Sequence, residues 1–377
     1  DMILKLLEES KGNVLDDVVL IETLAKAKQT SGEIKAKVEE SEITEKQIDE
    51  TREQYRPVAY RGSLLYFCIS NLSTIDPMYQ YSLQWFTRLF GIGIDESPDA
   101  VEINARVQNL IDYFTYKLYV NICRSLFEKH KLLFSFITSI AILRGNGEID
   151  SNEWRFLISG QGMSNPEELK NPDPSWIVTR AWESICALST LSNFKGLSDS
   201  FQGDQDLNAW KAFFDSNRPH RHELPGKWKD LEALQRLCIL NCLRPDKITF
   251  ALQDYVTEKL SSKFVEPPPF DLKVSYQDSS PSAPLIFVLV TGSDPTKMFY
   301  SFAEQMGMGG ERSPGISLGQ GQDKAAENLI ANGKEQGNWV YLQNCHLYVS
   351  WMPKLEQICE DIDPNETHDD FRLWLTS

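Results

Sequence analysis

The chain has 377 residues, of which 41% are hydrophobic and 11% aromatic, a composition typical of folded domains rather than of disordered chains. This length is sufficient for two or three domains, each with its own hydrophobic core. The formal net charge of −16 argues against a nucleic-acid-binding protein, because the phosphate backbone requires a basic surface.

The cysteines and the apolar runs narrow the class of protein further. Seven cysteines, an odd number scattered along the chain, do not suggest a disulfide framework, so we expect a reducing compartment. No apolar run approaches the ~20 residues that span a bilayer, and no signal peptide is visible. The chain opens within a helical pattern and stops at 371–377, a predicted strand, so we expect a piece of a longer polypeptide.

Residues 1–56 are predicted to form a helical hairpin, in which Gly12 and Asn13 interrupt the first apolar stripe. A charged helix is expected from about Ser31 to Arg56, where Pro57 would end it. About half of the residues on its predicted contact face, the seam, are polar, so the hairpin can pack only weakly and is expected to contact a partner element. The alternative is a solvent-exposed helix whose periodicity arises by chance. The seam residues have coiled-coil spacing and are Ile34, Val38, Ser41, Glu45, Ile48, Arg52 and Tyr55.

Residues 57–160 are predicted to be helical throughout and apolar on most helix faces, which indicates a compact helical domain. A polar, proline-bearing stretch at 161–174 has the composition of a linker. Further helices are expected over Trp176–Leu191, over Asp230–Leu243 and then up to Leu260.

From residue 284 the pattern alternates between strand and helix, which predicts a parallel sheet with helices on both faces. We therefore predict an α/β plus all-α protein, in which 161–377 form a large α/β domain after the hairpin and the helical domain. The expected strands are Leu285–Val290, Ile316–Leu318, Trp339–Leu342 and Phe371–Thr376. The expected helices are Asp294–Met306, Asp323–Asn332 (stopped by Gly333) and Trp351–Ile362.

The first of these strands leads into a glycine-bearing turn and then a helix, which is the shape of a phosphate-binding P-loop. A working loop reads GxxxxGK[ST], but here the second glycine is absent and Lys297 stands one position early. Asp294 adds negative charge where phosphate would lie, and Pro295 removes a backbone donor. The degenerate positions of this loop are Gly292, Ser293, Asp294 and Lys297.

A second departure from the sequence of P-loop ATPases lies at the end of the strand Trp339–Leu342. P-loop ATPases carry acidic residues there, one for magnesium and one to activate water. Here Gln343 and Asn344 are both neutral amides that can neither bind a metal as anions nor act as bases. His346 and the loop Gly319–Gln322 are weaker candidates, and a structural role explains each without a ligand. Hydrolysis at this place is not expected, and neither is a metal site.

Several runs of residues carry a resemblance to a known family. Four runs resemble the sixth AAA+ module of dynein heavy chains: GSDPTK, ISLGQGQ, WVYLQNCHLYVSWMPKLE and FRLWLTS. Their residues are more similar to those of axonemal dyneins than to those of cytoplasmic dyneins. The runs YRPVAYRGSLLYF, DPMYQYSLQWF and NEWRFLISG resemble the fifth module, and GNVLDDVVLIETL with the charged helix resembles the buttress hairpin. The resemblance covers nearly the whole chain and implies module boundaries after residues 56 and 160.

The resemblance implies a non-catalytic, force-transmitting part of a microtubule motor ring in ciliary and flagellar movement. The buttress would contact the stalk that carries the microtubule-binding tip, through Ile34, Val38, Ile48 and Tyr55. This segment would need no cofactor, whereas ATP and magnesium would bind other modules of the parent chain. Implied partners are the stalk, neighbouring AAA+ modules, the C-terminal region, the intermediate and light chains and microtubules, without nucleic acid or membrane. The implied location is the cytoplasm and cytoskeleton, in the axoneme of the cilium.

Two other functions remain open at this point. An autonomous NTPase could bind or hydrolyse nucleotide with Lys297 and an unrecognised acid such as Glu304 or Asp323. A scaffold protein could retain the AAA+ frame for assembly alone. Nucleotide affinity that depends on Lys297 would distinguish the first of these from the force-transmitting function.

Overall fold

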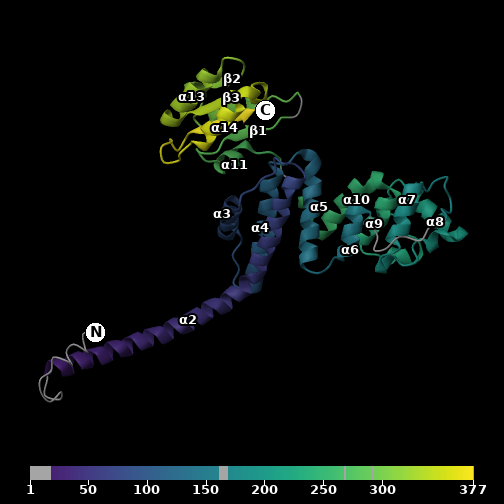
Figure 1. The fold of residues 1–377 in the computed structure, drawn as a ribbon, viewed down its shortest axis with the longest axis horizontal. Coiled ribbons are helices and arrows are strands. Elements are labelled where there is room, and N and C mark those ends of the chain that lie inside the picture. The colour runs from purple at the N-terminus through teal and green to yellow at the C-terminus, as the bar shows by residue number, and fades with distance from the viewer. Residues whose placement is uncertain (1–17, 161–168, 267–268, 290–291, 377) are drawn as a thin grey trace. The chain divides into compact units, whose positions relative to one another are not determined.

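The computed structural model describes residues 18–160, 169–266, 269–289 and 292–376. The chain divides into two compact units, Asp1–Pro268 and Pro269–Ser377, which we call the helical unit and the sheet unit (Figure 1). The first arm of the predicted hairpin, with its break at Gly12 and Asn13, lies outside the described residues. Within the described residues, no helix is both long enough and apolar enough to cross a membrane.

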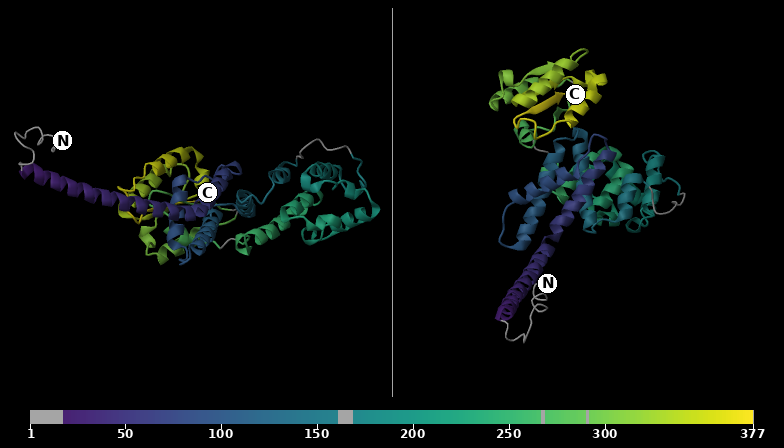
Figure 2. Two further views of the ribbon diagram at one scale, coloured as in Figure 1. Left: turned by 90° about the horizontal axis from the view of Figure 1, so that it is seen from below. Right: turned by 60° about the vertical axis from the view of Figure 1, so that its left-hand side comes forward.

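The helical unit begins with α2 (Val18–Ser70), a single helix of 53 residues that contains Pro57. The prediction that the helix stops at Pro57 is therefore wrong. A proline inside a helix loses one hydrogen bond and costs ~3 kcal/mol. The residues that follow it offset this cost, because Leu65 and Ile69 are buried in the main hydrophobic core. The part of α2 before Pro57 extends away from this core (Figures 1 and 2).

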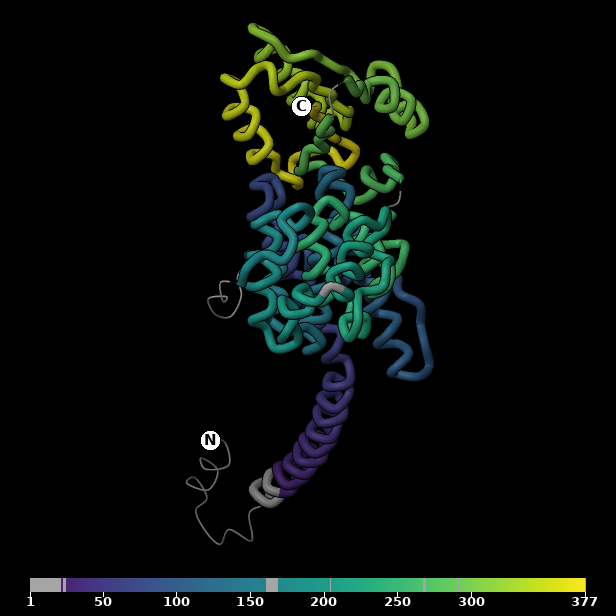
Figure 3. Tube along the Cα trace, turned by 90° about the vertical axis from the view of Figure 1, so that its right-hand side faces the viewer, coloured from purple at the N-terminus to yellow at the C-terminus, as the bar shows by residue number. Residues whose placement is uncertain are grey.

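The remaining helices of this unit pack around α2 and around one another, and buried side chains from residue 65 to residue 264 belong to one hydrophobic cluster. In Figure 3 the helices α6 to α10 of this unit lie together, in teal and green. The α-helices are α3 (Leu83–Glu96), α4 (Ile103–Cys123), α5 (Glu128–Gly145), α6 (Ser151–Ser159), α7 (Thr179–Leu188), α8 (Asp204–Asp215), α9 (Ala233–Leu243) and α10 (Ile248–Lys259).

Local sequence signals explain where several of these helices begin and end. Ser82 and Asp150 cap α3 and α6 by accepting hydrogen bonds from backbone amides of the first turn. Gly160 takes a left-handed conformation, with φ of 70°, and ends α6. A reciprocal capping box between Glu232 and Gln235 starts α9.

Residues 169–266 pack into the same core as 57–160, so the compact units divide at 268/269. The predicted module boundary lies at 160/161 instead. Packing units and the modules of a ring are different divisions of a chain, so the predicted module boundaries stay predictions.

The sheet unit contains four parallel strands in the order β1-β4-β3-β2. The strands are β1 (Leu285–Phe287), β2 (Gly315–Ser317), β3 (Trp339–Gln343) and β4 (Arg372–Thr376), and the α-helices are α11 (Leu272–Gln277), α12 (Thr296–Gln305), α13 (Asp323–Gln336) and α14 (Met352–Glu360). Short 3-10 helices in the two units are η1 (Asn71–Thr74), η2 (Ser192–Phe194), η3 (Asp199–Phe201), η4 (Pro219–Arg221), η5 (Gly226–Asp230), η6 (Pro245–Lys247), η7 (Ser262–Phe264), η8 (Gly310–Arg312), η9 (Cys345–Leu347) and η10 (Val349–Trp351).

Helices cover both faces of this sheet, as the alternation of strand and helix predicts. Along β3, Trp339 and Tyr341 pack with α11 and α12, whereas Val340 and Leu342 pack with α13 and α14. This alternation of side chains is the period of two that a strand requires. The α/β part of the predicted fold class is confirmed, and so is the all-α part that precedes it.

Two predicted boundaries in the sheet unit are wrong. Paired strand in β1 ends at Phe287, three residues earlier than predicted, and its middle residue Ile286 is exposed. Helix α13 passes through Gly333 and ends at Gly337, which has the left-handed φ of 74°. Gly333 is instead a packing position, because a Cβ there would lie 2.7 Å from Cγ2 of Val340.

Candidate functional site

The candidate site lies at the edge of the sheet where the strands end. Strands β1 and β3 both run parallel to β4 and lie on either side of it, so the loops that follow them leave from the same edge. The structure therefore brings the P-loop-like turn after β1 to the same edge as the amide pair after β3. The hydroxyls of Thr296 and Tyr341 are 3.4 Å apart and link the start of α12 to β3.

In the P-loop-like turn, the protein supplies its own anion to the helix N-terminus. Gly292 has a left-handed φ of 87°. Oδ1 of Asp294 accepts a hydrogen bond of 2.9 Å from the backbone amide of Thr296, the first residue of α12. Hydrogen bonding to the side chain of Thr296, and then to its backbone amide, lowers the pKa of the Asp294 carboxyl. The amide that a phosphate would use at the start of the helix is therefore occupied by a carboxylate.

Neither Lys297 nor Ser293 replaces the backbone amide that Asp294 occupies. Both residues are exposed, and Lys297 forms no ion pair with any residue that the structure describes. Lys297 lies in the first turn of α12, one position before Met298, which is also exposed. The predicted shift of the lysine by one position thus leaves it on the solvent side of the helix.

The amide pair at the end of β3 has a structural role. Asn344 has a φ of 57°, a left-handed conformation that asparagine tolerates better than most residues. Its side-chain Nδ2 donates to Oγ of Ser317 at 2.9 Å, and its backbone amide donates to Oγ1 of Thr376 at 3.0 Å. Asn344 therefore joins β3 to its two neighbours, β2 and β4. Gln343 continues the ladder, since its carbonyl accepts from the amide of Leu318.

The remaining sequence candidates are dispersed around this edge. Gly321 has a φ of 84° in the turn before α13, and the amide of Gln322 bonds the carbonyl of Gly319, which a tight turn explains without a ligand. His346 and Glu304 are exposed. In the described ranges, no group of three or more His, Cys, Asp or Glu residues could hold a metal ion.

A packed aromatic layer lies under the candidate site, and the sequence analysis missed it. Phe299 of α12 stacks on Tyr341 of β3, with ring centroids 4.3 Å apart, and contacts Trp374 of β4 at 5.3 Å. All three side chains are buried. The signal was present as aromatic residues at alternate positions of β3 and at matching positions of α12. This layer packs α12 against the sheet and so stabilises the frame of the domain.

The other predicted surface lies on the part of α2 before Pro57. Ile34, Val38 and Ile48 are exposed, with 55%, 49% and 49% of their surfaces accessible. They share one face of the helix, because Ile34 and Ile48 are two heptads apart. Tyr55 differs, because it is half-buried and packs against a small cluster that contains Val58.

A four-stranded parallel sheet between two helical layers, with a glycine-bearing turn leading from β1 to α12, defines the sheet unit as a P-loop domain of the AAA+ type. The family model of the dynein heavy chain region D6 P-loop domain matches residues 280–377, all within this unit. The chain belongs to the dynein heavy chain family, as a segment of axonemal type, which places it in the axoneme of cilia and flagella.

Similarity to individual proteins extends over the whole chain. It is 48% identical to dynein axonemal heavy chain 1 and 46% identical to dynein axonemal heavy chain 3, both of Homo sapiens. It is 41% identical to the dynein-1-beta heavy chain, flagellar inner arm I1 complex, of Chlamydomonas reinhardtii. Each alignment covers 100% of this chain and only 8% or 9% of the relative. The resemblance to axonemal dyneins is thereby confirmed.

Proposed function

We propose that this segment is a non-catalytic, force-transmitting part of a dynein motor ring. It would couple ATP-driven rearrangement in other modules to the microtubule-binding stalk, and so contribute to ciliary and flagellar movement. The observation that carries the proposal is the continuity of α2, in which the turns after Pro57 pack into the helical core and the longer part before Pro57 is exposed.

The geometry of α2 suits a lever. At 1.5 Å per residue, a helix of 53 residues is about 80 Å long. Beyond Pro57, α2 contacts α4 and α5, and Leu65 and Ile69 are buried in the core they share. A rotation of this core would therefore move the exposed part of α2 before Pro57 as one body, because packed cores transmit displacement rather than absorb it.

The surface of α2 before Pro57 suits contact that forms and breaks. Ile34, Val38 and Ile48 supply apolar contacts at coiled-coil spacing. Polar seam positions such as Glu45 weaken such packing, as a switching contact requires. We propose that this seam is the stalk contact, in a buttress formed by residues 1–56. Residues 57–160 would belong to the fifth module and residues 161–377 to the sixth.

The sheet unit supports a role without catalysis. Asp294 occupies the amide of Thr296 where phosphate would bind, and Asn344 uses its side chain to bridge strands. The amide of Asn344 offers neither an anionic magnesium ligand nor a general base where P-loop ATPases carry acidic residues. In this proposal ATP and magnesium act at other modules, while intermediate chains, light chains and microtubules are partners of the whole heavy chain.

A crosslink tests the proposal directly. In a whole axonemal heavy chain that contains this segment, a disulfide from position 38 of α2 to the facing stalk helix is expected to uncouple ATPase rate from microtubule affinity. A matched crosslink that joins two positions within α2, such as 34 and 38, is expected to leave the coupling unchanged. If the motor with α2 joined to the stalk remains fully coupled, α2 does not transmit the movement.

The nucleotide-binding alternative has its own test. We expect isothermal titration of the 377-residue chain with Mg-ATP to show no micromolar affinity. Micromolar affinity that is abolished by Lys297→Ala, and retained by Lys324→Ala on the exposed face of α13, would support an NTPase module instead.

A further inference from the structure

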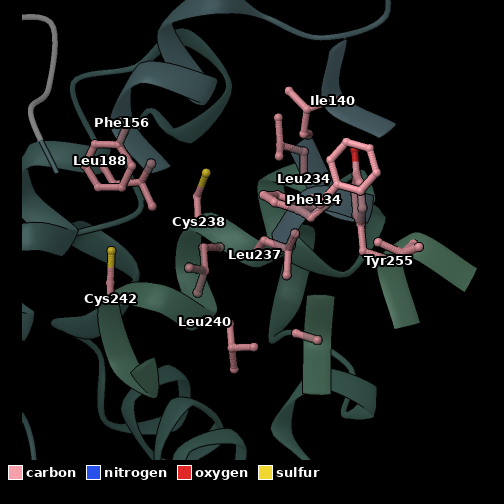
Figure 4. Close-up of a cluster of buried hydrophobic side chains, with 14 of the residues drawn as sticks. Phe134, Ile140, Phe156, Leu188, Leu234, Leu237, Cys238, Leu240, Cys242 and Tyr255 are labelled. Atoms are coloured by element: carbon pink, nitrogen blue, oxygen red, sulfur yellow. The ribbon is translucent and has the colours of Figure 1, made fainter. Parts of the chain in front are cut away.

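The helix faces that pack permanently in the helical unit are apolar. Leu234, Leu237 and Leu240 of α9 belong to one buried cluster with Phe134 of α5 (Figure 4). The seam of α2 before Pro57 differs from such faces, because polar residues make up part of it and its side chains are largely exposed. Apolar contact alone specifies a partner poorly on such a seam, so charge must supply part of the specificity.

Charged side chains flank the seam at a regular spacing. Lys35, Glu42, Asp49 and Arg56 follow one another at intervals of seven residues in α2. Each directly follows a seam residue, so the four form one line along the side of the seam, which we call the flanking line. No other set of positions seven apart between residues 31 and 56 is charged at every position. The order of charges along the flanking line is basic, acidic, acidic, basic.

The flanking line is available to a partner helix. All four of its side chains are exposed, and the first two form no ion pair with any residue that the structure describes. Asp49 pairs with Arg52 at 3.2 Å and Arg56 pairs with Glu53 at 3.0 Å, both within the helix. Because these pairs are exposed, each contributes little and can be exchanged for a contact with a partner.

A second copy of this chain does not match the order of charges. If two α2 helices overlapped antiparallel along the whole flanking line, Lys35 would face Arg56 and Glu42 would face Asp49. Like charges would then meet at every position, which destabilises the pair. In a parallel pair in register, most of the line would face uncharged threonines. The charges therefore favour a different helix, on which the order is the opposite one.

We infer that the stalk helix facing α2 carries a complementary line of charges, in the order acidic, basic, basic, acidic at intervals of seven residues. This inference rests on the proposed stalk contact and names the chemistry of its partner. The order is the same from either end, so it holds for a parallel and for an antiparallel stalk helix. Ile34, Val38 and Ile48 supply the apolar part of the contact. The charges select its register, because a shift by one heptad brings like charges together at most of the positions that still overlap.

Two labelled, end-blocked peptides of four heptads test this inference by fluorescence anisotropy with the 377-residue chain. Both peptides have the same seam of Ile and Ala and the same composition. The matching peptide has Glu, Lys, Lys and Glu beside the seam in its successive heptads, whereas the inverted peptide has Lys, Glu, Glu and Lys. The matching peptide is expected to bind about tenfold more tightly than the inverted peptide. Equal affinities for the two peptides would overturn the inference.

Charge exchange on α2 shows whether the flanking line is responsible for this preference. The variant K35E/E42K/D49K/R56E inverts every charge of the line at constant net charge, and it is expected to reverse the order of the two affinities. Loss of folding could not produce such a reversal. A preference for the matching peptide that survives in this variant would overturn the inference.

A control variant makes the same kind of exchange on the side of α2 away from the seam. It is K26E/E39K/E40K/K46E, which also keeps the net charge, and all four positions are exposed. This variant is expected to bind the matching peptide about tenfold more tightly than the inverted one, as the wild type does. If it reverses the preference as the first variant does, the flanking line is not the site of recognition.

A photocrosslink in the whole heavy chain identifies the facing residues. Benzoylphenylalanine in place of Glu45, a seam position between Glu42 and Asp49, is expected to crosslink to a stalk helix. The crosslinked stretch is expected to carry Lys or Arg at two positions seven apart. Acidic residues at those positions would overturn the inference.

The results separate this inference from the proposed function. The peptides report only recognition by α2, whereas the crosslink from position 38 reports coupling within the motor. A clear preference for the matching peptide, together with a crosslinked motor that stays coupled, would support charge recognition and contradict force transmission. Equal peptide affinities, together with a crosslinked motor that is uncoupled, would contradict charge recognition alone.

Discussion

Asn344 shows how one residue can occupy a catalytic position and perform a structural task. The residue stands where P-loop ATPases carry an acid, yet its amide donates to Ser317 and its backbone to Thr376. An aspartate cannot donate through its side chain, so it could not make the bond to Ser317 in the same way. The change from acid to amide therefore removes chemistry and adds a bridge between strands.

Substitution of Asn344 separates its side-chain bond from its backbone conformation. Asn344→Ala is expected to destabilise the sheet unit by about 1–3 kcal/mol, because it loses a hydrogen bond and places a Cβ residue without local bonding in a left-handed conformation. Asn344→Gly loses only the bond and should cost about 1 kcal/mol less than alanine. Amide hydrogen exchange of β3 and β4, measured by mass spectrometry, checks this order. Equal protection in both variants and the wild type would contradict it.

Gly333 gives a second prediction at the scale of a residue. A methyl group there would meet Val340 at 2.7 Å and Phe371 at 3.0 Å, and both side chains are fully buried. Gly333→Ala is therefore expected to destabilise the sheet unit by about 1–3 kcal/mol, despite the higher helix propensity of alanine. Urea unfolding measures the change.

Gly91 is the matched control for Gly333. It also lies inside a helix, α3, but a Cβ there would meet nothing within 4 Å. Gly91→Ala is expected to stabilise its unit by about 0.5–1 kcal/mol. If both alanine substitutions stabilise their units, or both destabilise them, the contacts of Gly333 do not determine the effect of its substitution on stability.

At the scale of elements, the sequence predicts most helices and strands and fails where tertiary contacts decide. Gly333 and Gly337 look alike in a pattern of residues, but only the contacts of Gly333 with Val340 show which of them ends α13. The losses at the P-loop can be seen in the sequence, whereas the bonds of Asn344 cannot. Its partners Ser317 and Thr376 lie 27 and 32 residues away, and their proximity depends on the strand order.

Helix α2 is the clearest case in which a local sequence rule, that proline ends a helix, gives the wrong prediction. A proline is a strong stop signal, but burial of the following turns keeps the helix continuous through Pro57. Pro57→Ala restores the missing amide and removes the steric conflict, so it is expected to stabilise the helix locally by about 1–3 kcal/mol. Hydrogen exchange of residues 53–61 should slow accordingly. Unchanged exchange there would mean that packing has already removed the cost of the proline.

At the scale of the whole molecule, each compact unit has its own hydrophobic core, and each has a different part in the proposed function. The sheet unit has the frame of a P-loop domain, packed by its aromatic layer, with an amide where P-loop ATPases carry an acid. The helical unit anchors α2, whose part before Pro57 offers a half-polar seam with exposed apolar residues. Both features support the proposed role in mechanical transmission.

Thr51 permits a test of mechanical transmission in the intact motor. It is exposed in α2 and lies between the seam residue Ile48 and the buried turns that follow Pro57. Thr51→Pro costs roughly 3 kcal/mol in a helix interior and should interrupt the lever between the seam and the core. Thr51→Ala is the matched control, since alanine favours the helix at the same position.

We expect a heavy chain with Thr51→Pro to keep its basal ATPase rate and lose most of its stimulation by microtubules, because only the link between the seam and the core is interrupted. With Thr51→Ala, both rates are expected to equal those of the wild type. Steady-state ATPase assays with and without microtubules give both values. Normal stimulation of the proline variant, with circular dichroism showing the helix interrupted, would show that continuity of α2 is not what couples the ring to the microtubule.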